Sequence, residues 1–295
     1  MWNTQSACTL PFDPRGERFD WIILVWKIPP LNYYTSGQNN MDCFRKIFSA
    51  NNLNVLGMIH IQALPGTPRN KLSVPEILDK ALTEVKIYKD NHVDGLIIEN
   101  MHDIPYIHTD KVGPEITASM AILAGANKQA LSVAKAAGLD FIRAEGFVFS
   151  HVADEGIMNA CAGDLLRYRK QIGAEDILVF TDIKKKHSAH AITSDVDIGD
   201  TAKAAEFFLS DGVIVTGSQT GLAADVSELI DVQKAVDIPV LIGSGVTNDN
   251  VEQYKSAHGL IVGSYFKKDG HWNNDLDTDR LKIFMESVKS LRTVI

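Results

Sequence analysis

Short apolar runs separated by helical patterns recur along the chain from Val55 to its end. Two of the runs lie near the C-terminus, at residues 239–242 and 259–262, and each is followed by Gly-Ser. Short runs without alternation are typical of strands buried on both faces of a parallel sheet. Residues 248–257 between them have helical character, so this region predicts strand, helix and strand, with a glycine turn at the carboxyl end of each strand.

The same alternation of strands and helices is predicted through most of the chain. Strands are predicted at residues 55–61, 93–99, 141–145, 177–182 and 213–216, in addition to the two C-terminal runs. Helices are predicted at residues 75–90, 113–121, 130–137, 163–172, 201–209, 227–236 and 278–291. An eighth strand is suspected at Ile122-Leu123. Strands that alternate with helices predict βα units and a parallel sheet.

Two observations favour a closed (β/α)8 TIM barrel over a doubly wound sheet. Polar residues follow almost every predicted strand, as they do at the catalytic end of a barrel. The first strand is followed by His60 and residues 61–66, which contain no glycine-rich dinucleotide fingerprint. We therefore expect one barrel domain over residues 51–295.

One segment is too short for the βα unit that the alternation of strands and helices requires. Between Glu99 and Ile122 the chain must supply a loop, the second helix and the third strand. The helix predicted from Gly113 passes directly into residues 122–125, with no connecting loop and hardly any strand. The sequence therefore predicts a truncated helix 2/strand 3 unit.

Residues 1–50 show no sustained period and are expected to form a poorly ordered extension, of which residues 1–40 should pack little against the barrel. Pro29-Pro30 and the polar residues 36–40 indicate a linker, and Met41 opens a plausible short helix and is a second possible start. The apolar residues 21–26 are too short to span a bilayer. They also follow acidic residues, which fits neither a signal nor a transit peptide, so the default location is the cytoplasm.

Charge and cysteine content exclude some classes of protein. The formal net charge of −8, with no basic tract, argues against a general nucleic-acid binder and against binding to an anionic membrane. The cysteines Cys8, Cys43 and Cys161 are far apart and have no metal-ligand or redox spacing. A small anionic ligand held locally is compatible with both observations.

Several motifs, in the right order, resemble the BtpA/SgcQ family over roughly residues 55–291. They are Gly57-Met58-Ile59-His60, residues 63–68 (ALPGTP), 94–100 (DGLIIEN), 112–115 (VGPE), 140–143 (DFIR), 165–169 (LLRYR), 215–218 (VTGS) and 243–247 (GSGVT). The resemblance implies a TIM barrel of the phosphate-binding type. One branch of the family is named for a role in photosystem I biogenesis, which implies an assembly role as an alternative to an enzyme.

The chain departs from the family pattern in three ways. The family is longer between Glu115 and Ile122, and the N-terminal extension is not a family feature. After the fifth strand the family has Asp-x-His-x-Lys-His, whereas this chain has Asp182, Lys186 and His187 at the matching positions but Lys184 in place of the first histidine.

Five residues near predicted strand ends are candidates for catalysis: Glu99, Asp182, His187, Lys186 and His60. Carboxylates that end buried apolar runs are costly unless they are paired or used, so Glu99 and Asp182 indicate acid/base work. The alternative is a salt bridge to Lys184, Lys186 or Arg143. A lysine at a barrel mouth can bind phosphate or form a Schiff base.

A divalent metal ion is a weaker alternative for the same residues. His60, Glu99, Asp182 and His187 carry suitable donors for such an ion. No tight spacing such as HxH or HExxH supports it.

Three Gly-Ser turns after consecutive strands predict a phosphate site. The residues are Thr216, Gly217, Ser218, Gly243, Ser244, Gly245, Gly263 and Ser264. The leading hypothesis is an enzyme that acts on a small phosphorylated metabolite by acid/base chemistry. The alternatives are a non-enzymatic assembly or stability factor and a catalytically impaired isoform. A homo-oligomer is compatible with each of these functions.

Overall fold

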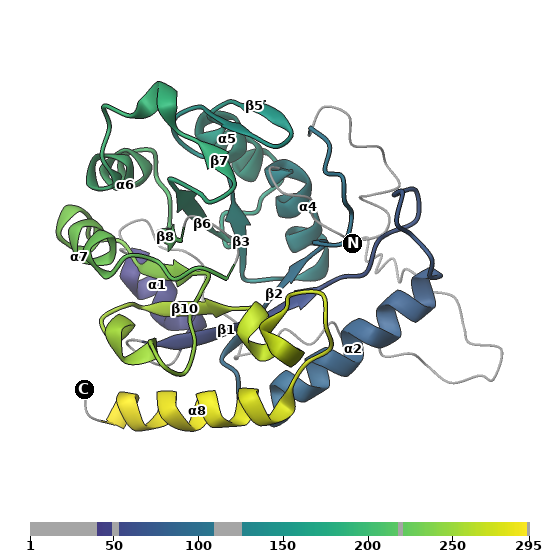
Figure 1. Cartoon of the computed structure of the whole chain (residues 1–295). Coiled ribbons are helices and arrows are strands. Elements are labelled where there is room, and N and C mark those ends of the chain that lie inside the picture. The colour runs from purple at the N-terminus through teal and green to yellow at the C-terminus, as the bar shows by residue number, and fades with distance from the viewer. Residues whose placement is uncertain (1–39, 49–52, 109–125, 218–220, 294–295) are drawn as a thin grey trace, which may run out of the picture.

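A computed structural model describes residues 40–48, 53–108, 126–217 and 221–293. Its centre is a seven-stranded sheet in the order β2-β1-β10-β9-β8-β6-β3, in which every neighbouring pair is parallel (Figure 1). The strands are β1 (Asn54–His60), β2 (Gly95–Glu99), β3 (Phe141–Ala144), β6 (Leu178–Ile183), β8 (Gly212–Thr216), β9 (Val240–Gly243) and β10 (Gly259–Val262).

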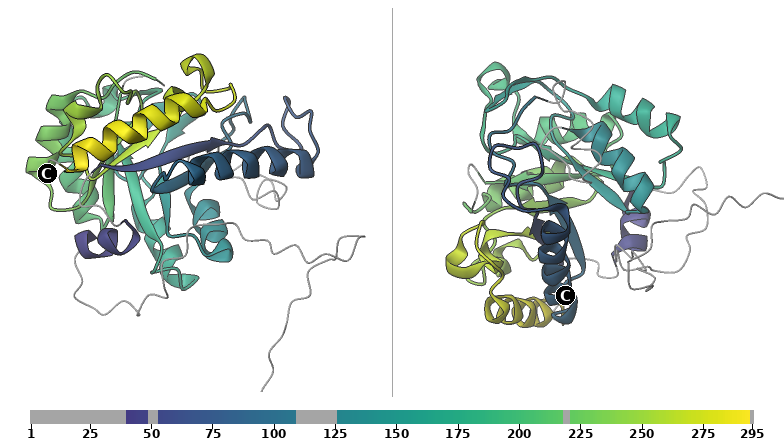
Figure 2. Two further views of the ribbon diagram at one scale, coloured as in Figure 1. Left: turned by 90° about the horizontal axis from the view of Figure 1, so that it is seen from below. Right: turned by 90° about the vertical axis from the view of Figure 1, so that its right-hand side faces the viewer.

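Helices follow most of these strands and cover the outer face of the sheet. They are α2 (Val74–Asp90), α4 (Asn127–Ala137), α5 (Ala162–Gln171), α6 (Ile198–Phe207), α7 (Val226–Ala235) and α8 (Thr278–Thr293). Helices α2 and α8 run side by side on this face (Figures 1 and 2). This arrangement confirms the predicted α/β barrel.

Local sequence explains where several helices begin and end. Ser73 and Glu76 form a capping box at the start of α2, and Asp197 and Asp225 accept hydrogen bonds from the first backbone N–H groups of α6 and α7. Helix α4 ends at Gly138, which adopts a left-handed conformation.

The prediction of a regular helix at residues 248–257 is wrong. The structure has only a 3-10 turn there, η3 (Val251–Tyr254). Asn250 explains the difference, because its side chain accepts a hydrogen bond from the Thr247 N–H and donates one to the Gly245 carbonyl. Such local side-chain bonds compete with regular helix formation.

The barrel domain begins before the predicted boundary at residue 50. Helix α1 (Asn40–Ile47) places Cys43 and Phe44 inside the sheet, with Phe48 directly after it. The Phe44 ring lies 6.0 Å from that of Phe180 on β6. The plausible short helix at Met41 therefore belongs to the core, because its apolar side chains fill the amino-terminal end of the barrel. Residues 1–39 of the expected extension lie outside the described residues.

Among the described residues the sheet is open, and β2 and β3 are its edges. In barrel order these are strands two and four, so the position between them belongs to the third strand. The helix predicted at residues 113–121 and the strand suspected at Ile122-Leu123 lie outside the described residues. The segment for which the truncation is predicted thus includes the undescribed residues 109–125, between β2 and β3 in the chain.

A second, small antiparallel sheet lies beyond the carboxyl ends of β3 and β6. It has the order β5-β4-β7 and consists of β4 (His151–Ala153), β5 (Gly156–Met158) and β7 (Ser188–Ala189). Strands β4 and β5 form a hairpin, and β4 is also paired to β7 in the segment following β6. No helix within the described ranges is long and apolar enough to cross a membrane.

Candidate functional site

The polar end of the barrel follows from the alternation of side chains along each strand. One inward layer is apolar and packs on α1. It contains Met58, Ile97, Phe141, Phe180, Ile214, Leu241 and Ile261. Two positions further along the same strands, the next inward layer contains His60, Glu99, Arg143, Asp182, Thr216, Gly243 and Gly263. Because all seven strands are parallel, this polar layer lies at one carboxyl-terminal mouth.

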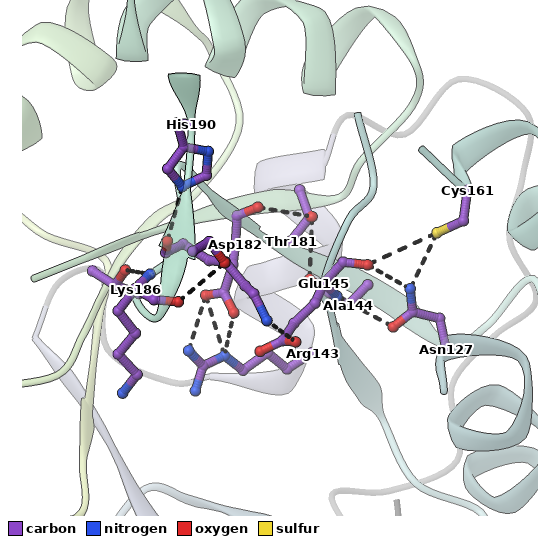
Figure 3. A network of polar contacts seen from close by, with 12 residues as sticks. Asn127, Arg143, Ala144, Glu145, Cys161, Thr181, Asp182, Lys186 and His190 are labelled. Atoms are coloured by element: carbon purple, nitrogen blue, oxygen red, sulfur yellow. Dashed lines mark hydrogen bonds and ion pairs between the residues drawn. The ribbon is translucent and has the colours of Figure 1, made fainter. Parts of the chain in front are cut away.

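Arg143 and Asp182 form a buried ion pair in this layer (Figure 3). The Arg143 Nε lies 3.0 Å from Asp182 Oδ2, and its Nη2 lies 3.0 Å from Oδ1. Burial lowers the pKa of Arg143, but the charges of Asp182 and Glu99 outweigh it and raise that pKa above its ordinary value. Burial raises the pKa of Asp182 and Arg143 opposes the rise. The guanidinium therefore stays charged and orients the carboxylate.

A second pair joins Glu145, directly after β3, to Lys185, with 2.7 Å between Oε2 and Nζ. Burial raises the pKa of Glu145, but Lys185 outweighs it and the net pKa is lowered. Asn127 fixes the backbone of Glu145, because its amide donates to the Glu145 carbonyl and its oxygen accepts from the Glu145 N–H. Glu145 is thus held as a carboxylate at the rim of the mouth.

Two charged side chains of the mouth differ from these pairs. Among the described residues, the Glu99 carboxylate has no hydrogen bond or ion pair. The same holds for the Lys186 ammonium (Figure 3). Burial and Arg143 lower the pKa of Lys186, whereas Glu99, Asp182 and Glu145 oppose that shift. Among the charged side chains of the described mouth, these two therefore stand apart from the two ion pairs.

His60 is buried and neutral. Its Nδ1 lies 3.0 Å from the carbonyl oxygen of Trp272, and a carbonyl can only accept, so Nδ1 carries the proton and Nε2 has the free lone pair. Burial lowers the pKa of His60 to about 4, although the hydrogen bond to Trp272 opposes the shift. His60 can accept a hydrogen bond at the mouth, but it is uncharged at neutral pH.

We expect this burial to make the protein sensitive to acid. The folded His60 resists protonation down to about pH 4, whereas the unfolded histidine takes up a proton below about pH 6.5. Stability is therefore lost as pH falls through this window, by about 2 kcal/mol between pH 7 and pH 5 for His60 alone. Urea unfolding at both pH values should show a smaller loss in His60→Gln. The exposed His271→Gln variant should lose as much as the unaltered protein.

The glycine turns are more crowded than expected. Gly245, one of the residues predicted to form the phosphate site, has φ +66°. A Cβ there would lie 2.1 Å from the backbone of Leu222, so the space beside it is filled by protein. At Gly217 it would lie 2.3 Å from the Leu222 carbonyl oxygen. These two glycines let the loops after β8 and β9 pack together, so a substitution at Gly245 would test that packing.

Gly243 and Gly263 leave space inside the mouth. A Cβ at Gly243 would lie 2.8 Å from Ile214 Cγ2 and 3.6 Å from Arg143 Nη2, so the missing side chain gives the guanidinium room. A Cβ at Gly263 would lie 3.2 Å from Met58 and 3.4 Å from the His60 ring. Directly after Gly263 the chain forms the 3-10 turn η4 (Ser264–Phe266).

The remaining candidates are dispersed. The Thr216 hydroxyl accepts a hydrogen bond from the Lys186 N–H, and the Ser244 hydroxyl accepts one from the Gly221 N–H. Ser218 lies outside the described residues. His187 is exposed on the loop after β6, with φ +55°, away from the inward layer.

The arrangement of donors does not favour the metal hypothesis. Within the described part of the chain, no three His, Cys, Asp or Glu side chains are grouped as metal ligands. Both oxygens of Asp182 already accept from Arg143. A metal ion that used Asp182 would therefore have to share these oxygens with the guanidinium.

Three charged contributors to the site were not among the candidate residues. Arg143 was considered only as a salt-bridge partner, and Glu145 and Lys185 were not candidates, yet all three form ion pairs in the mouth. The alternation of Phe141 and Arg143 along β3 places the arginine inside, and this signal was available in the sequence. The contact between Trp272 and His60 joins positions 212 residues apart and had no local signal.

The fold and the mouth define a TIM barrel with a charged carboxyl-terminal end. Comparison with solved structures agrees on the fold: Mycobacterium tuberculosis tryptophan synthase matches with a TM-score of 0.50 at 13% identity, over 84% of this chain and 96% of that chain. The BtpA family model matches residues 51–129 and 122–290, so the chain belongs to the BtpA family. The two matched segments overlap at the place where the truncated unit lies.

Relatives support this membership along nearly their full lengths. A Caenorhabditis elegans protein, named as uncharacterized and mitochondrial, is 51% identical over 269 residues, which cover 84% of this chain and 97% of that protein. An uncharacterized Pyrococcus furiosus protein is 33% identical, over 81% of this chain and 96% of its own. The Photosystem I biogenesis protein BtpA of Synechocystis is 29% identical, over 84% of this chain and 91% of its own.

Proposed function

We propose that this protein is an enzyme that binds a small phosphorylated metabolite at the carboxyl-terminal mouth of its barrel and acts on it by acid/base chemistry. The observation that carries the proposal is the polar layer itself. It combines two ion pairs with two charged groups, Glu99 and Lys186, that have no partner among the described residues. Charged groups arranged in this way converge on one volume above the apolar layer.

The phosphate of the ligand is assigned to the turns after β9 and β10. In TIM barrels the loops after strands seven and eight, with the start of a short extra helix, often form the phosphate site. Here Gly245 and Gly263 occupy those turns, and η4 begins at Ser264. The absence of a side chain at Gly243 and Gly263 leaves that side of the mouth accessible.

The acid/base work is assigned to Glu99, with His60 as a hydrogen-bond acceptor. Glu99 ends β2, and its charge acts on both Arg143 and Lys186. Asp182 is fixed by two hydrogen-bonded oxygens, so its role is to hold Arg143 in place and to set the field of the site. Lys186 supplies a positive charge, or a nucleophile, opposite the carboxylates.

The mouth favours an enzyme over a scaffold on energetic grounds. Replacing a buried ion pair by packed apolar residues is often neutral or stabilising, by about 1–4 kcal/mol. A barrel that served only as a support would have no use for Arg143 and Asp182 at the centre of its mouth. The assembly role printed in the name of the Synechocystis relative remains the rival function.

We expect phosphate to stabilise the folded protein. A ligand that binds only the native state adds about 2.7 kcal/mol at 100 times its Kd, which corresponds to several degrees in Tm for a domain of this size. Thermal unfolding should be followed with increasing phosphate, and with a triose phosphate, at ionic strength matched with chloride. A saturating rise in Tm supports the proposal, and identical curves in phosphate and chloride contradict it.

Two glycines of β10 provide a matched control. A Cβ added at Gly263 or at Gly259 would lie 3.2 Å from a neighbouring side chain in each case, but Gly263 lies at the mouth and Gly259 at the opposite end of the strand. We expect Gly263→Ala and Gly259→Ala to lose similar stability. Only Gly263→Ala should weaken phosphate stabilisation, by about ten-fold in apparent Kd. Equal phosphate responses in the two variants would remove the turn after β10 from the site.

A further inference from the structure

We propose that Lys186 is a covalent nucleophile that forms an imine with the carbonyl group of an aldehyde or ketone substrate. This inference rests on the proposed function and narrows it, because it makes the phosphorylated metabolite a carbonyl compound. Its basis is a contrast among three consecutive lysines that share one loop. The Lys184 Nζ donates to the Thr193 carbonyl at 2.8 Å, and the Lys185 Nζ donates to Glu145 at 2.7 Å. The Lys186 Nζ has no such partner among the described residues (Figure 3).

The backbone around Lys186 is held in a defined position. Its N–H donates to the Thr216 hydroxyl at the end of β8, 3.2 Å away. The residues on either side of the Lys185-Lys186 pair, Lys184 with φ +46° and His187 with φ +55°, are both left-handed. Non-glycine residues in this region cost free energy and are kept where the surrounding structure requires them. Here they form the sharp turn in which Lys186 lies between the ends of β6 and β8.

The surroundings of Lys186 suit a neutral amine. Burial lowers its pKa, and the neighbouring guanidinium of Arg143 acts in the same direction. A lysine that is desolvated beside another cation is activated as a nucleophile, because more of it is present as free amine at neutral pH. Lys185 behaves in the opposite way: burial lowers its pKa, but Glu145 outweighs burial and raises it. The pKa of Lys185 is therefore shifted toward the charged ammonium, whereas that of Lys186 is shifted toward the neutral amine.

The reaction balances without any further reagent. The Lys186 amine adds to the carbonyl carbon, so a C–N bond forms and the carbonyl oxygen takes up a proton. The resulting carbinolamine loses its hydroxyl group as water after a second proton transfer, which leaves a protonated imine. The imine withdraws electrons from the adjacent carbon and makes a C–H or C–C bond there easier to break. We assign these proton transfers to Glu99, which lies in the same inward layer of the mouth and has no partner among the described residues.

Pyridoxal 5′-phosphate is a direct probe, because it carries both an aldehyde and a phosphate. The full-length protein is mixed with it at neutral pH, the imine absorbance is recorded, borohydride is added to reduce the imine, and the modified lysine is located by mass spectrometry of peptides. We expect label on Lys186 at least ten-fold above that on Lys184 or Lys185. Lys186→Met should abolish the specific absorbance band, whereas Lys184→Met should retain it.

The variant also has a readout that does not depend on labelling. Lys186 is a half-buried charge without an ion-pair partner, so Lys186→Met should unfold at the same temperature as the unaltered protein or higher, and a folding failure is not expected. Equal labelling of all three lysines, or label only on exposed lysines elsewhere, would overturn the proposal.

Pyridoxal without the phosphate separates the two proposals. If it labels Lys186 as well as the phosphorylated probe does, and phosphate leaves Tm unchanged, the nucleophile stands and the phosphate site fails. If phosphate raises Tm but neither aldehyde labels Lys186, the phosphate site stands and the nucleophile fails.

Discussion

Asp182→Asn is expected to cost about 3–5 kcal/mol of unfolding free energy, because it leaves the Arg143 guanidinium in the barrel without its counter-charge. The Asp182 carboxylate is 1% exposed and the Arg143 side chain 15%, so water cannot replace the lost charge. Asparagine keeps the shape of aspartate, but it removes the charge and replaces one acceptor oxygen by an NH2 donor. Urea unfolding at pH 7, followed by circular dichroism, measures the loss.

A double variant distinguishes two quantities: the stability lost when one charge of the Arg143–Asp182 pair is removed, and the stability that the intact pair contributes. Arg143→Met with Asp182→Leu replaces the whole pair by apolar side chains, and we expect it to recover most of the stability lost in Asp182→Asn. It should also abolish ligand binding at the mouth. A double variant as unstable as the single one would show that the pair holds the barrel together, which would favour the scaffold function.

Restoring the longer segment found in the family between Glu115 and Ile122 is expected to raise Tm by about 10 °C. The described sheet ends at β2 and β3, and each edge leaves backbone N–H and C=O groups of its strand without a partner in that sheet. A full third strand would pair with both edges, and a full second helix would cover apolar surface. Burial of about 200 Å² of such surface is worth on the order of 5 kcal/mol, which corresponds to the expected rise.

The open edges also predict self-association. Unpaired strand edges and uncovered apolar surface favour pairing with a second copy of the chain. Size-exclusion chromatography of both forms should show the present chain at a larger apparent mass and the restored form as a monomer. Equal Tm values and two monomer-sized peaks would mean that residues 109–125 close the barrel unaided.

Much of this architecture could be predicted from the order of residues alone. The strands buried on both faces are continuous apolar runs, and their alternation with helical patterns admits few topologies. The α2 helix was predicted within one residue of its start because Pro75 and the apolar positions that follow mark it. The shortened βα unit between Glu99 and Ile122 could also be recognised in the sequence, because a βα repeat needs a minimum length of chain.

The chemistry of the mouth was only partly accessible in this way. Glu99, Asp182 and His60 could be identified because they end apolar runs, and parallel strands bring such ends together. Whether a charge is paired depends on distances across the barrel, which the local sequence does not encode. Asp182 and Lys185 found partners on or directly after β3, at Arg143 and Glu145, whereas Glu99 and Lys186 found none among the described residues.

The sequence by itself determined the barrel, its polar end and the place of its truncation, because these depend on patterns within single strands and helices. Only the tertiary structure decided that α1 fills the base of the barrel and that Gly245 packs against the Leu222 backbone. It also decided that, of three adjacent lysines, Lys184 and Lys185 have hydrogen-bonding partners for their ammonium groups, whereas Lys186 has none among the described residues. Each of these outcomes depends on contacts between segments far apart in the chain, where packing and electrostatics select among partners that look alike in sequence.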